Sequence, residues 1–83
     1  MFLTEQNRIY MEDAQGRIVA EITFPEILPG VYNIDHTFMD NSLRGQGIAS
    51  KLVQAAVDEI RRRSGEVQAT CSYAVKWLSE RGN

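Results

Sequence analysis

Apolar and polar residues alternate along the first quarter of the chain. Ile9 and Met11 alternate with more polar neighbours up to a turn at residues 13–16. The alternation then resumes with Ile18, Ala20, Ile22 and Phe24. A period of two is typical of a β-strand with one buried face, and Gly16 supplies the positive φ that hairpin turns use. Residues 7–24 therefore predict a β-hairpin.

Two prolines separate this hairpin from a third predicted strand. Pro25 and the Pro29-Gly30 pair interrupt the alternation. Residues 31–39 are rich in β-branched and aromatic side chains, which favour strands. We expect one unbroken strand there, with Asp35 on one face and the other face carrying Tyr32, Ile34, His36 and Phe38.

Beyond residue 47 the period lengthens to that of an α-helix. Apolar residues follow at helical spacing: Ala49, Leu52, Val53, Ala56, Val57 and Ile60. Such spacing predicts an amphipathic helix that buries one stripe. On the opposite face Asp58 and Glu59 each precede an arginine by four residues, the order that stabilises helices. The arginines at 61–63 are therefore interpreted as a solvated helix end.

The remaining residues predict a strand and a second helix. Ser64 and Gly65 end the first helix, residues 66–71 form a short strand, and Ser72 caps a helix that buries Ala74, Trp77 and Leu78. The order β-β-β-α-β-α predicts an α/β (α+β) domain with a mixed, mostly antiparallel sheet of about four strands and two helices. Because a strand–helix–strand crossover joins parallel strands, residues 31–39 and 66–71 become neighbours. Their carboxyl ends share one edge, where open α/β sheets hold ligands.

Composition restricts the class of protein. The 83 residues are 43% hydrophobic and 24% charged, so we expect a single globular domain over residues 1–83. The net charge of −2 argues against nucleic-acid binding. The chain has one cysteine, no export signal and no long apolar stretch, so a cytoplasmic protein without a membrane partner is expected.

Two glycines flank one polar residue directly before the predicted first helix, in Arg44-Gly45-Gln46-Gly47. The first turn of a helix has unpaired N–H groups at the positive end of its dipole, which favours anions. Glycines let a phosphate approach these amides, while Gln46 and Ser50 offer donors and Arg44 a full charge. The spacing fits neither a Walker A loop nor the G-x-G-x-x-G fingerprint. On the glycines alone, a phosphate loop and a turn without a ligand both stay open.

Together with its flanking segments, this loop resembles a known family. Residues 44–49, Arg-Gly-Gln-Gly-Ile-Ala, match the R/Q-x-x-G-x-G/A signature of the GNAT acyltransferase superfamily. Residues 34–38 and 70–78 resemble its small, single-domain YjdJ-type branch. The resemblance spans about residues 6–81. It implies a GNAT-like fold and acetyl-coenzyme A (acetyl-CoA) as the cofactor.

The resemblance also implies where that cofactor binds. Its diphosphate would rest on the loop amides, and its pantetheine arm would run between the two parallel strands. The loop chemistry and the resemblance together predict these cofactor-binding residues: Phe38, Met39, Arg44, Gly45, Gln46, Gly47, Ile48, Ala49, Ser50 and Lys76. Larger relatives have two helices after the first strand and further strands after the last helix, which this sequence lacks. This difference leaves the acceptor open and suggests an exposed site for a polypeptide, a polyamine or a partner protein.

Three residues are candidates for catalysis. Acetyl transfer to an amine needs a neutral nucleophile, a route for its proton and a stabilised oxyanion. Cys71 lies between a strand and a helix, whose N-terminus can lower the thiol pKa and favour an acyl-enzyme; core packing is the alternative. His36 can act as a general base or pack in the core. Tyr73 can protonate the departing thiolate, as tyrosines do in larger relatives, or pack.

Other side chains near these candidates have simpler interpretations. Lys76 reaches a phosphate or only water, and Trp77 is assigned to the core. With one His and one Cys, the sequence predicts no metal site.

We therefore expect an acetyl-CoA-dependent N-acetyltransferase that acts on an unidentified amine. Two alternatives stay open: a module that binds or senses coenzyme A or acyl-CoA without turnover, and a protein-interaction domain with a relic loop. The expected partners are acetyl-CoA and an amine or protein acceptor. The expected assembly is a monomer or a weak homodimer.

Overall fold

Strands occupy most of the N-terminal half of residues 2–81, the part of the chain that the computed structural model describes. They are β1 (Leu3–Thr4), β2 (Arg8–Glu12), β3 (Ile18–Thr23), β4 (Glu26–Leu28), β5 (Val31–Ile34), β6 (His36–Met39) and, after the first helix, β7 (Glu66–Ala69). The helices are a short 3-10 turn, η1 (Asn41–Leu43), then α1 (Ile48–Arg62) and α2 (Ser72–Glu80). Among these residues no helix has the length and apolar character needed to cross a bilayer.

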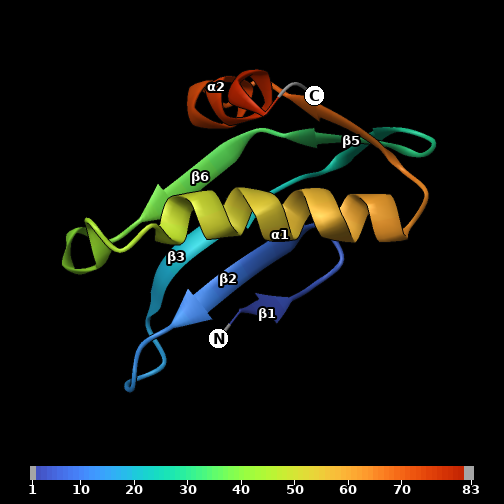
Figure 1. The fold of residues 1–83 in the computed structure, drawn as a ribbon. Coiled ribbons are helices and arrows are strands. Elements are labelled where there is room, and N and C mark those ends of the chain that lie inside the picture. The colour runs from blue at the N-terminus through green and yellow to red at the C-terminus, as the bar shows by residue number, and fades with distance from the viewer. Residues whose placement is uncertain (1, 82–83) are drawn as a thin grey trace.

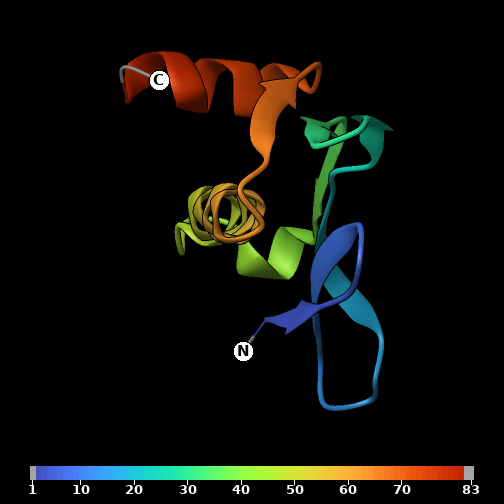
Figure 2. The ribbon, with the colours of Figure 1, turned by 90° about the vertical axis from the view of Figure 1, so that its right-hand side faces the viewer.

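The strands form two sheets. One has the order β1-β2-β3-β6 and is antiparallel throughout; the other has the order β4-β5-β7, in which β5 and β7 are parallel. The helix α1 connects β6 to β7 and packs across strands of both sheets. Both helices lie on one side of the strands (Figures 1 and 2). The predicted hairpin, crossover helix, parallel pair and α+β class are thus confirmed.

The unbroken strand predicted over residues 31–39 is wrong, because the chain breaks at Asp35. β5 ends at Ile34, and β6 then pairs with β3 instead of continuing beside β7. This change of partner turns the backbone, so Ile34 is fully buried whereas His36 and Phe38 are exposed. The predicted common face of these three side chains does not exist. The division into two sheets follows from the same break.

The apolar stripe of α1 forms the centre of the hydrophobic core. Five of its members are at most 1% exposed: Leu52, Val53, Ala56, Val57 and Ile60. They pack against the sheets and α2 through Ile9, Ala20, Ile22, Phe24, Ile34, Ala74 and Trp77. The predicted stripe is confirmed except at its first residue, Ala49, which is half-buried. Leu78 is half-buried as well.

The arginines after residue 60 do not form one solvated group, so that interpretation is wrong in part. Arg61 and Arg62 are exposed, but Arg63 packs against the N-terminal segment. Its guanidinium donates to the carbonyl of Gln6 (2.6 Å) and to the carboxylate of Glu59 (2.8 Å). Arg63 therefore fastens the turn between β1 and β2 to the end of α1.

One predicted ion pair along α1 also differs. The sequence predicts that Asp58 pairs with Arg62, but Arg62 binds Glu59, three residues before it. Asp58 instead accepts a hydrogen bond from Gln54 (2.8 Å). Glu59 thus holds two arginines, Arg62 and Arg63, at the helix end.

Candidate functional site

The loop before α1 contains two glycines in the left-handed backbone region. Gly45 has a φ of 84°, and Gly47, the N-cap of α1, has a φ of 71°. Residues with a Cβ rarely adopt these angles, which explains why both are glycine. A Cβ atom added at either position would meet no atom within 4 Å. The space in front of α1 is therefore open to a ligand.

The first amides of α1 have no acceptor among the described residues. The N–H of Lys51 bonds to the Gly47 carbonyl (3.2 Å), which begins the helical pattern. Over residues 2–81, no acceptor pairs with the N–H groups of Gly47, Ile48, Ala49 and Ser50, and Gly47 has no side-chain cap. Free amides at the positive end of a helix, here one of 15 residues, favour the binding of an anion.

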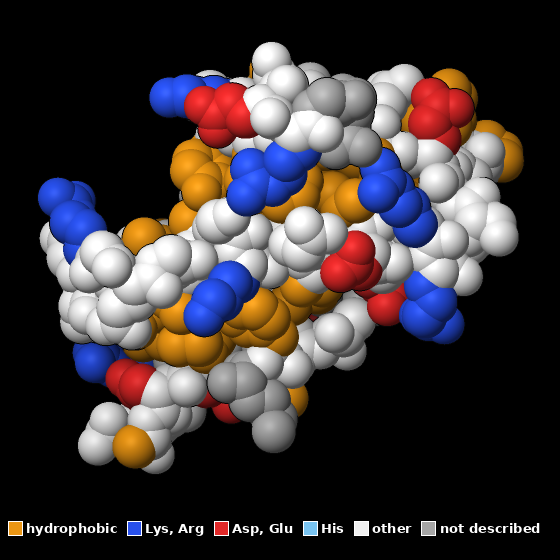
Figure 3. All heavy atoms as spheres, in the orientation of Figure 1, with side chains coloured by type: hydrophobic (Ala, Val, Ile, Leu, Met, Phe, Trp, Pro, Cys, Tyr) orange, Lys and Arg blue, Asp and Glu red, His pale blue; other side chains and the backbone are white. Residues whose placement is uncertain are grey.

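Side chains around the loop are only partly directed toward this space. Arg44 and Gln46 are exposed and form hydrogen bonds within residues 41–46. The Ser50 hydroxyl oxygen accepts from Trp77 Nε1 (2.9 Å), so it faces α2 rather than the loop. Lys and Arg side chains lie over α1 and beside α2, with hydrophobic side chains between the two helices (Figure 3). Arg44 and Gln46 thus bond within the loop segment, and Ser50 bonds to α2.

The strands separate at the carbonyl of Ile34. This carbonyl accepts hydrogen bonds from the N–H groups of Thr70 (3.0 Å) and Cys71 (3.1 Å). Beyond this point β6 is the outer strand of its sheet, and no described strand pairs with its free edge. The backbone of Phe38 and Met39 belongs to β6, where the resemblance places the pantetheine arm. We call this divergence of β6 from β7 the strand split.

Cys71 lies at the strand split as the N-cap of α2. It is half-buried, and its Sγ is 3.5 Å from the hydroxyl oxygen of Thr37 on β6. Burial raises the pKa of this thiol, but hydrogen bonds from Thr37 and from the backbone N–H groups of Ala74 and Tyr73 outweigh it and lower the pKa overall. A lowered thiol pKa favours the nucleophilic thiolate. Thr37 is not among the predicted site residues, because an unbroken strand would put His36 on the inner face instead.

The other two predicted catalytic residues do not gather around Cys71. His36 is exposed, and because neighbouring strand residues point to opposite faces, it faces away from Cys71 while Thr37 faces toward it. Tyr73 is 41% exposed and, with Lys76, lines a hollow of about 160 Å³ on α2. Core packing is therefore wrong for both His36 and Tyr73. Their roles in catalysis stay predictions.

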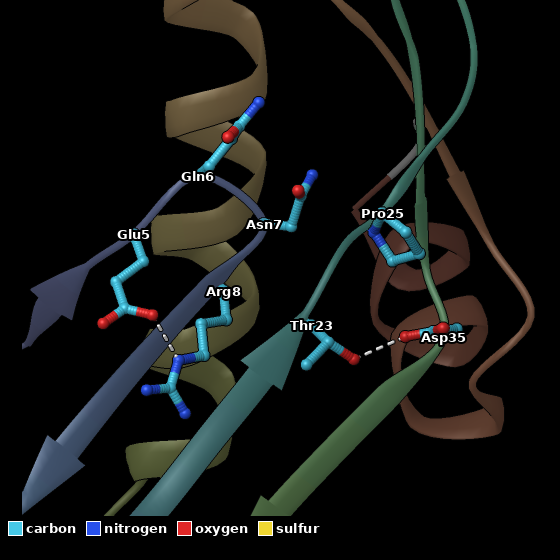
Figure 4. A pocket seen from close by; sticks show the side chains of 7 residues that line it. All are labelled: Glu5, Gln6, Asn7, Arg8, Thr23, Pro25 and Asp35. Atoms are coloured by element: carbon cyan, nitrogen blue, oxygen red, sulfur yellow. Dashed lines mark hydrogen bonds and ion pairs between the residues drawn. The ribbon is translucent and has the colours of Figure 1, made fainter.

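A larger cavity, of about 510 Å³, lies where the turn after β1, the end of β3 and the break at Asp35 meet. Its lining residues are Glu5, Gln6, Asn7, Arg8, Thr23, Pro25 and Asp35 (Figure 4). Arg8 binds both Glu5 and Glu21 at 2.7 Å. The Thr23 hydroxyl donates to the Asp35 carboxylate (2.5 Å). The sequence does not predict this cavity, because its walls come from separate segments that only the fold brings together.

Comparison with known proteins identifies the family. The sequence profile described as GCN5-related N-acetyl-transferase matches residues 8–83. The chain belongs to this family. The matched residues include the loop before α1 and both sides of the strand split. The predicted superfamily is thereby confirmed. The YjdJ-type branch stays a prediction. No curated protein sequence matches the chain.

Solved structures share the fold of this GCN5-related N-acetyltransferase family member. The solution structure of a GCN5-like protein from Staphylococcus aureus is 32% identical, with a TM-score of 0.79 over 98% of this chain and 79% of that one. A ribosomal-protein-alanine N-acetyltransferase from Brucella melitensis biovar Abortus 2308 is 22% identical, with a TM-score of 0.62 over 88% of this chain. An aminoglycoside acetyltransferase from an uncultured soil metagenomic sample, solved with sisomicin, is 19% identical, with a TM-score of 0.60 over 94% of this chain. The chain spans 59% of the length of each of the last two, whose likeness shows the fold alone.

Proposed function

We propose that this chain binds acetyl-CoA across the start of α1 and the strand split and transfers the acetyl group to an amine. The observation that carries the proposal is the row of free amides from Gly47 to Ser50, opened to solvent by glycine and adjoining the unpaired edge of β6. Family membership supports the choice of cofactor.

The residues present fit the two ends of such a cofactor. A diphosphate needs N–H donors that no side chain covers, and the open space before Gly45 and Gly47 provides them. A pantetheine arm carries amides that pair with a strand edge, and the backbone of β6 offers one at Phe38 and Met39. Lys76 and Arg44 add positive charge at the periphery, since both are exposed.

Bound acetyl-CoA supplies an activated acetyl thioester. The chain holds the diphosphate on the amides of α1 and orients the arm along β6. We propose Cys71 as the residue that exchanges with the acetyl group. Two observations support this: Thr37 stabilises its thiolate, and its Sγ lies beside the split. In a covalent route the Cys71 thiolate forms a new thioester and displaces coenzyme A as its thiolate, which takes a proton from water. A neutral amine then attacks this thioester, the Cys71 thiolate leaves, and the amine gives its extra proton to water. A direct transfer to the amine is the alternative route.

Binding or sensing of coenzyme A without turnover is the second candidate function. It is favoured by one observation: His36, the only imidazole of the chain, faces away from Cys71. The described residues therefore bring no imidazole to the thiol as a general base.

Calorimetry and intact mass test the proposal together. Gly47→Asn places a side chain at the mouth of α1, and Gly16→Asn is a matched control with a φ of 80° in the hairpin turn. Asn tolerates this backbone region, so both variants should fold. We expect acetyl-CoA to bind the wild type and Gly16→Asn equally and Gly47→Asn at least about tenfold more weakly, the loss of one charge-assisted hydrogen bond or more. Equal affinity for both variants would place the diphosphate elsewhere.

The covalent route has its own readout. After incubation with acetyl-CoA we expect the intact mass of the wild type to rise by one acetyl group, and that of Cys71→Ser to stay unchanged. Release of free thiol only when an amine is present, without a mass change, indicates direct transfer. Binding without thiol release indicates the sensing module.

A further inference from the structure

We propose that Arg81, the C-cap of α2, binds the 3′-phosphate of coenzyme A and makes the chain select coenzyme A over its 3′-dephospho form. This inference rests on the proposed function, which assigns the diphosphate to the amides at the start of α1. Spacing along the sequence does not predict this role, because Arg81 lies 31 positions after Ser50, the residue of α1 that it contacts.

The guanidinium of Arg81 is held beside the first turn of α1. Its Nη2 donates to the Ser50 hydroxyl oxygen (3.4 Å), and its Cζ lies 4.1 Å from the centre of the Trp77 ring. Side chains of a helix lean toward its N-terminus, so the Ser50 hydroxyl lies beside the turn whose amides have no acceptor among the described residues. Arg81 is exposed, so a ligand on those amides can reach its guanidinium.

The amides of α1 alone cannot balance the charge of the cofactor. The N-terminus of a helix is equivalent to roughly half a positive charge. A phosphate monoester carries about two negative charges at neutral pH, in addition to those of the diphosphate. Arg44, which precedes α1, donates to Asn41 within its own loop segment. Arg81 brings a full positive charge to the first turn from another element, and a guanidinium can donate two parallel hydrogen bonds to phosphate oxygens.

The length of α2 matches the distance between the two ends of the cofactor. Cys71 is the N-cap and Arg81 the C-cap of this helix of 9 residues, so the two caps lie about 15 Å apart along its axis. The pantetheine arm between the sulfur and the diphosphate has about as many backbone bonds as four residues, or roughly 14 Å when extended. With the acyl group at Cys71, the phosphates of the cofactor therefore lie level with Arg81.

The position of Arg81 favours the 3′-phosphate over the diphosphate. The amides from Gly47 to Ser50 supply N–H donors for the diphosphate, which coenzyme A and its 3′-dephospho form share. Arg81 contacts Ser50, the last residue of that row, from the side of α2 rather than from the loop. A phosphate attached outside the diphosphate is the group that meets a cation there. Its dianionic end is a strong partner for a guanidinium.

Calorimetry at 0.15 M salt tests the inference with coenzyme A and 3′-dephospho-coenzyme A as the probes. We expect the wild type to bind coenzyme A at least about tenfold more tightly than the dephospho form. In Arg81→Gln the affinity for coenzyme A should fall about tenfold, whereas the affinity for the dephospho form should stay the same, because it has no 3′-phosphate to lose. Glutamine keeps an N–H donor for Ser50, and unchanged binding of the dephospho form shows that the site is folded.

Arg61→Gln is the matched control. It removes an exposed arginine from the last turn of α1, well beyond the Debye length of about 8 Å from the first turn, and should bind both probes like the wild type. Equal affinity of the wild type for the two probes, or an equal loss for both probes in Arg81→Gln, would overturn the inference and leave the proposed cofactor site in place. A wild type that binds neither probe would contradict the proposed function and this inference with it.

Discussion

The indole N–H of Trp77 donates to the Ser50 hydroxyl at 2.9 Å, a bond that joins α2 to the first turn of α1. Arg81 donates to the same oxygen at 3.4 Å, and its guanidinium lies 4.1 Å from the centre of the Trp77 ring. The Ser50 hydroxyl therefore connects two elements of the proposed cofactor site: the start of α1 and the helix α2, whose N-cap is Cys71. Ser50 has a structural role in addition to its predicted part in binding.

Ser50→Ala should destabilise the protein by about 1–3 kcal/mol, because it leaves the N–H of a nearly buried indole without an acceptor. Trp77 is only 5% exposed, so water cannot readily replace the hydroxyl. Urea unfolding measures the change. Ser79→Ala, an exposed serine of α2, is the control and should stay within about 0.5 kcal/mol of the wild type. Equal stability of the two variants would mean that the Trp77 bond contributes nothing.

Thr37→Val should raise the pKa of Cys71 toward its usual range, because the lost hydroxyl stabilises the thiolate. Alkylation by iodoacetamide near neutral pH should slow accordingly, since only the thiolate reacts. The measurement is the pH dependence of the alkylation rate. Thr4→Val, on exposed β1, serves as the control. A pH profile of Thr37→Val that coincides with the wild type would exclude the proposed hydrogen bond.

Arg63→Met should destabilise the protein by about 1–3 kcal/mol, as expected for lost hydrogen bonds from a charged group. The methionine keeps some of the apolar contact with Tyr32 but loses the bonds to Gln6 and Glu59. Arg62→Met is the matched control, because Arg62 pairs with the same Glu59 while its side chain is 71% exposed; its cost should stay below about 1 kcal/mol. Chemical unfolding compares the two variants. A cost for Arg62→Met as large as that for Arg63→Met would contradict the role of Arg63 in fastening the turn between β1 and β2 to α1.

Glu59 predicts a specific pH dependence of stability. Hydrogen bonds from Arg62 and Arg63 lower the pKa of its carboxyl from 4.5 to about 2 in the folded protein. A lowered folded pKa gives stability that is complete above the unfolded pKa and is lost as the pH falls toward the folded one. We therefore expect Glu59→Gln to be less stable than the wild type at pH 7, and the difference to shrink between pH 4.5 and 2. Unfolding curves across this range measure it, and a difference that is constant with pH would contradict the assignment.

The elements with strong local signals could be predicted from the sequence. Helical spacing from Leu52 to Ile60 identified the buried face of α1, because burial of a continuous stripe follows directly from the period. The glycines at 45 and 47 indicated a special backbone before α1, and both have a positive φ. The parallel pairing of β5 with β7 followed from the handedness of the crossover.

The features that depend on tertiary partners could not be predicted. The break at Asp35 arises because the chain leaves β7 for β3, and no residue between 31 and 39 marks that exchange in the sequence. For the same reason Thr37, rather than His36, meets Cys71. Arg63 packs inward because it binds the carbonyl of Gln6, 57 residues away in the sequence. The spacing of residues along one helix cannot predict such a distant partner.

The central claim is that the free amides at the start of α1 receive the diphosphate of acetyl-CoA. Titration of the ¹⁵N-labelled protein with acetyl-CoA, followed by NMR of the backbone amides, tests it most directly. We predict that the largest shifts fall on residues 45–50, with further shifts at Phe38, Met39 and Cys71 along the strand split. Saturating acetyl-CoA that leaves the amides of residues 45–50 unmoved would contradict the account.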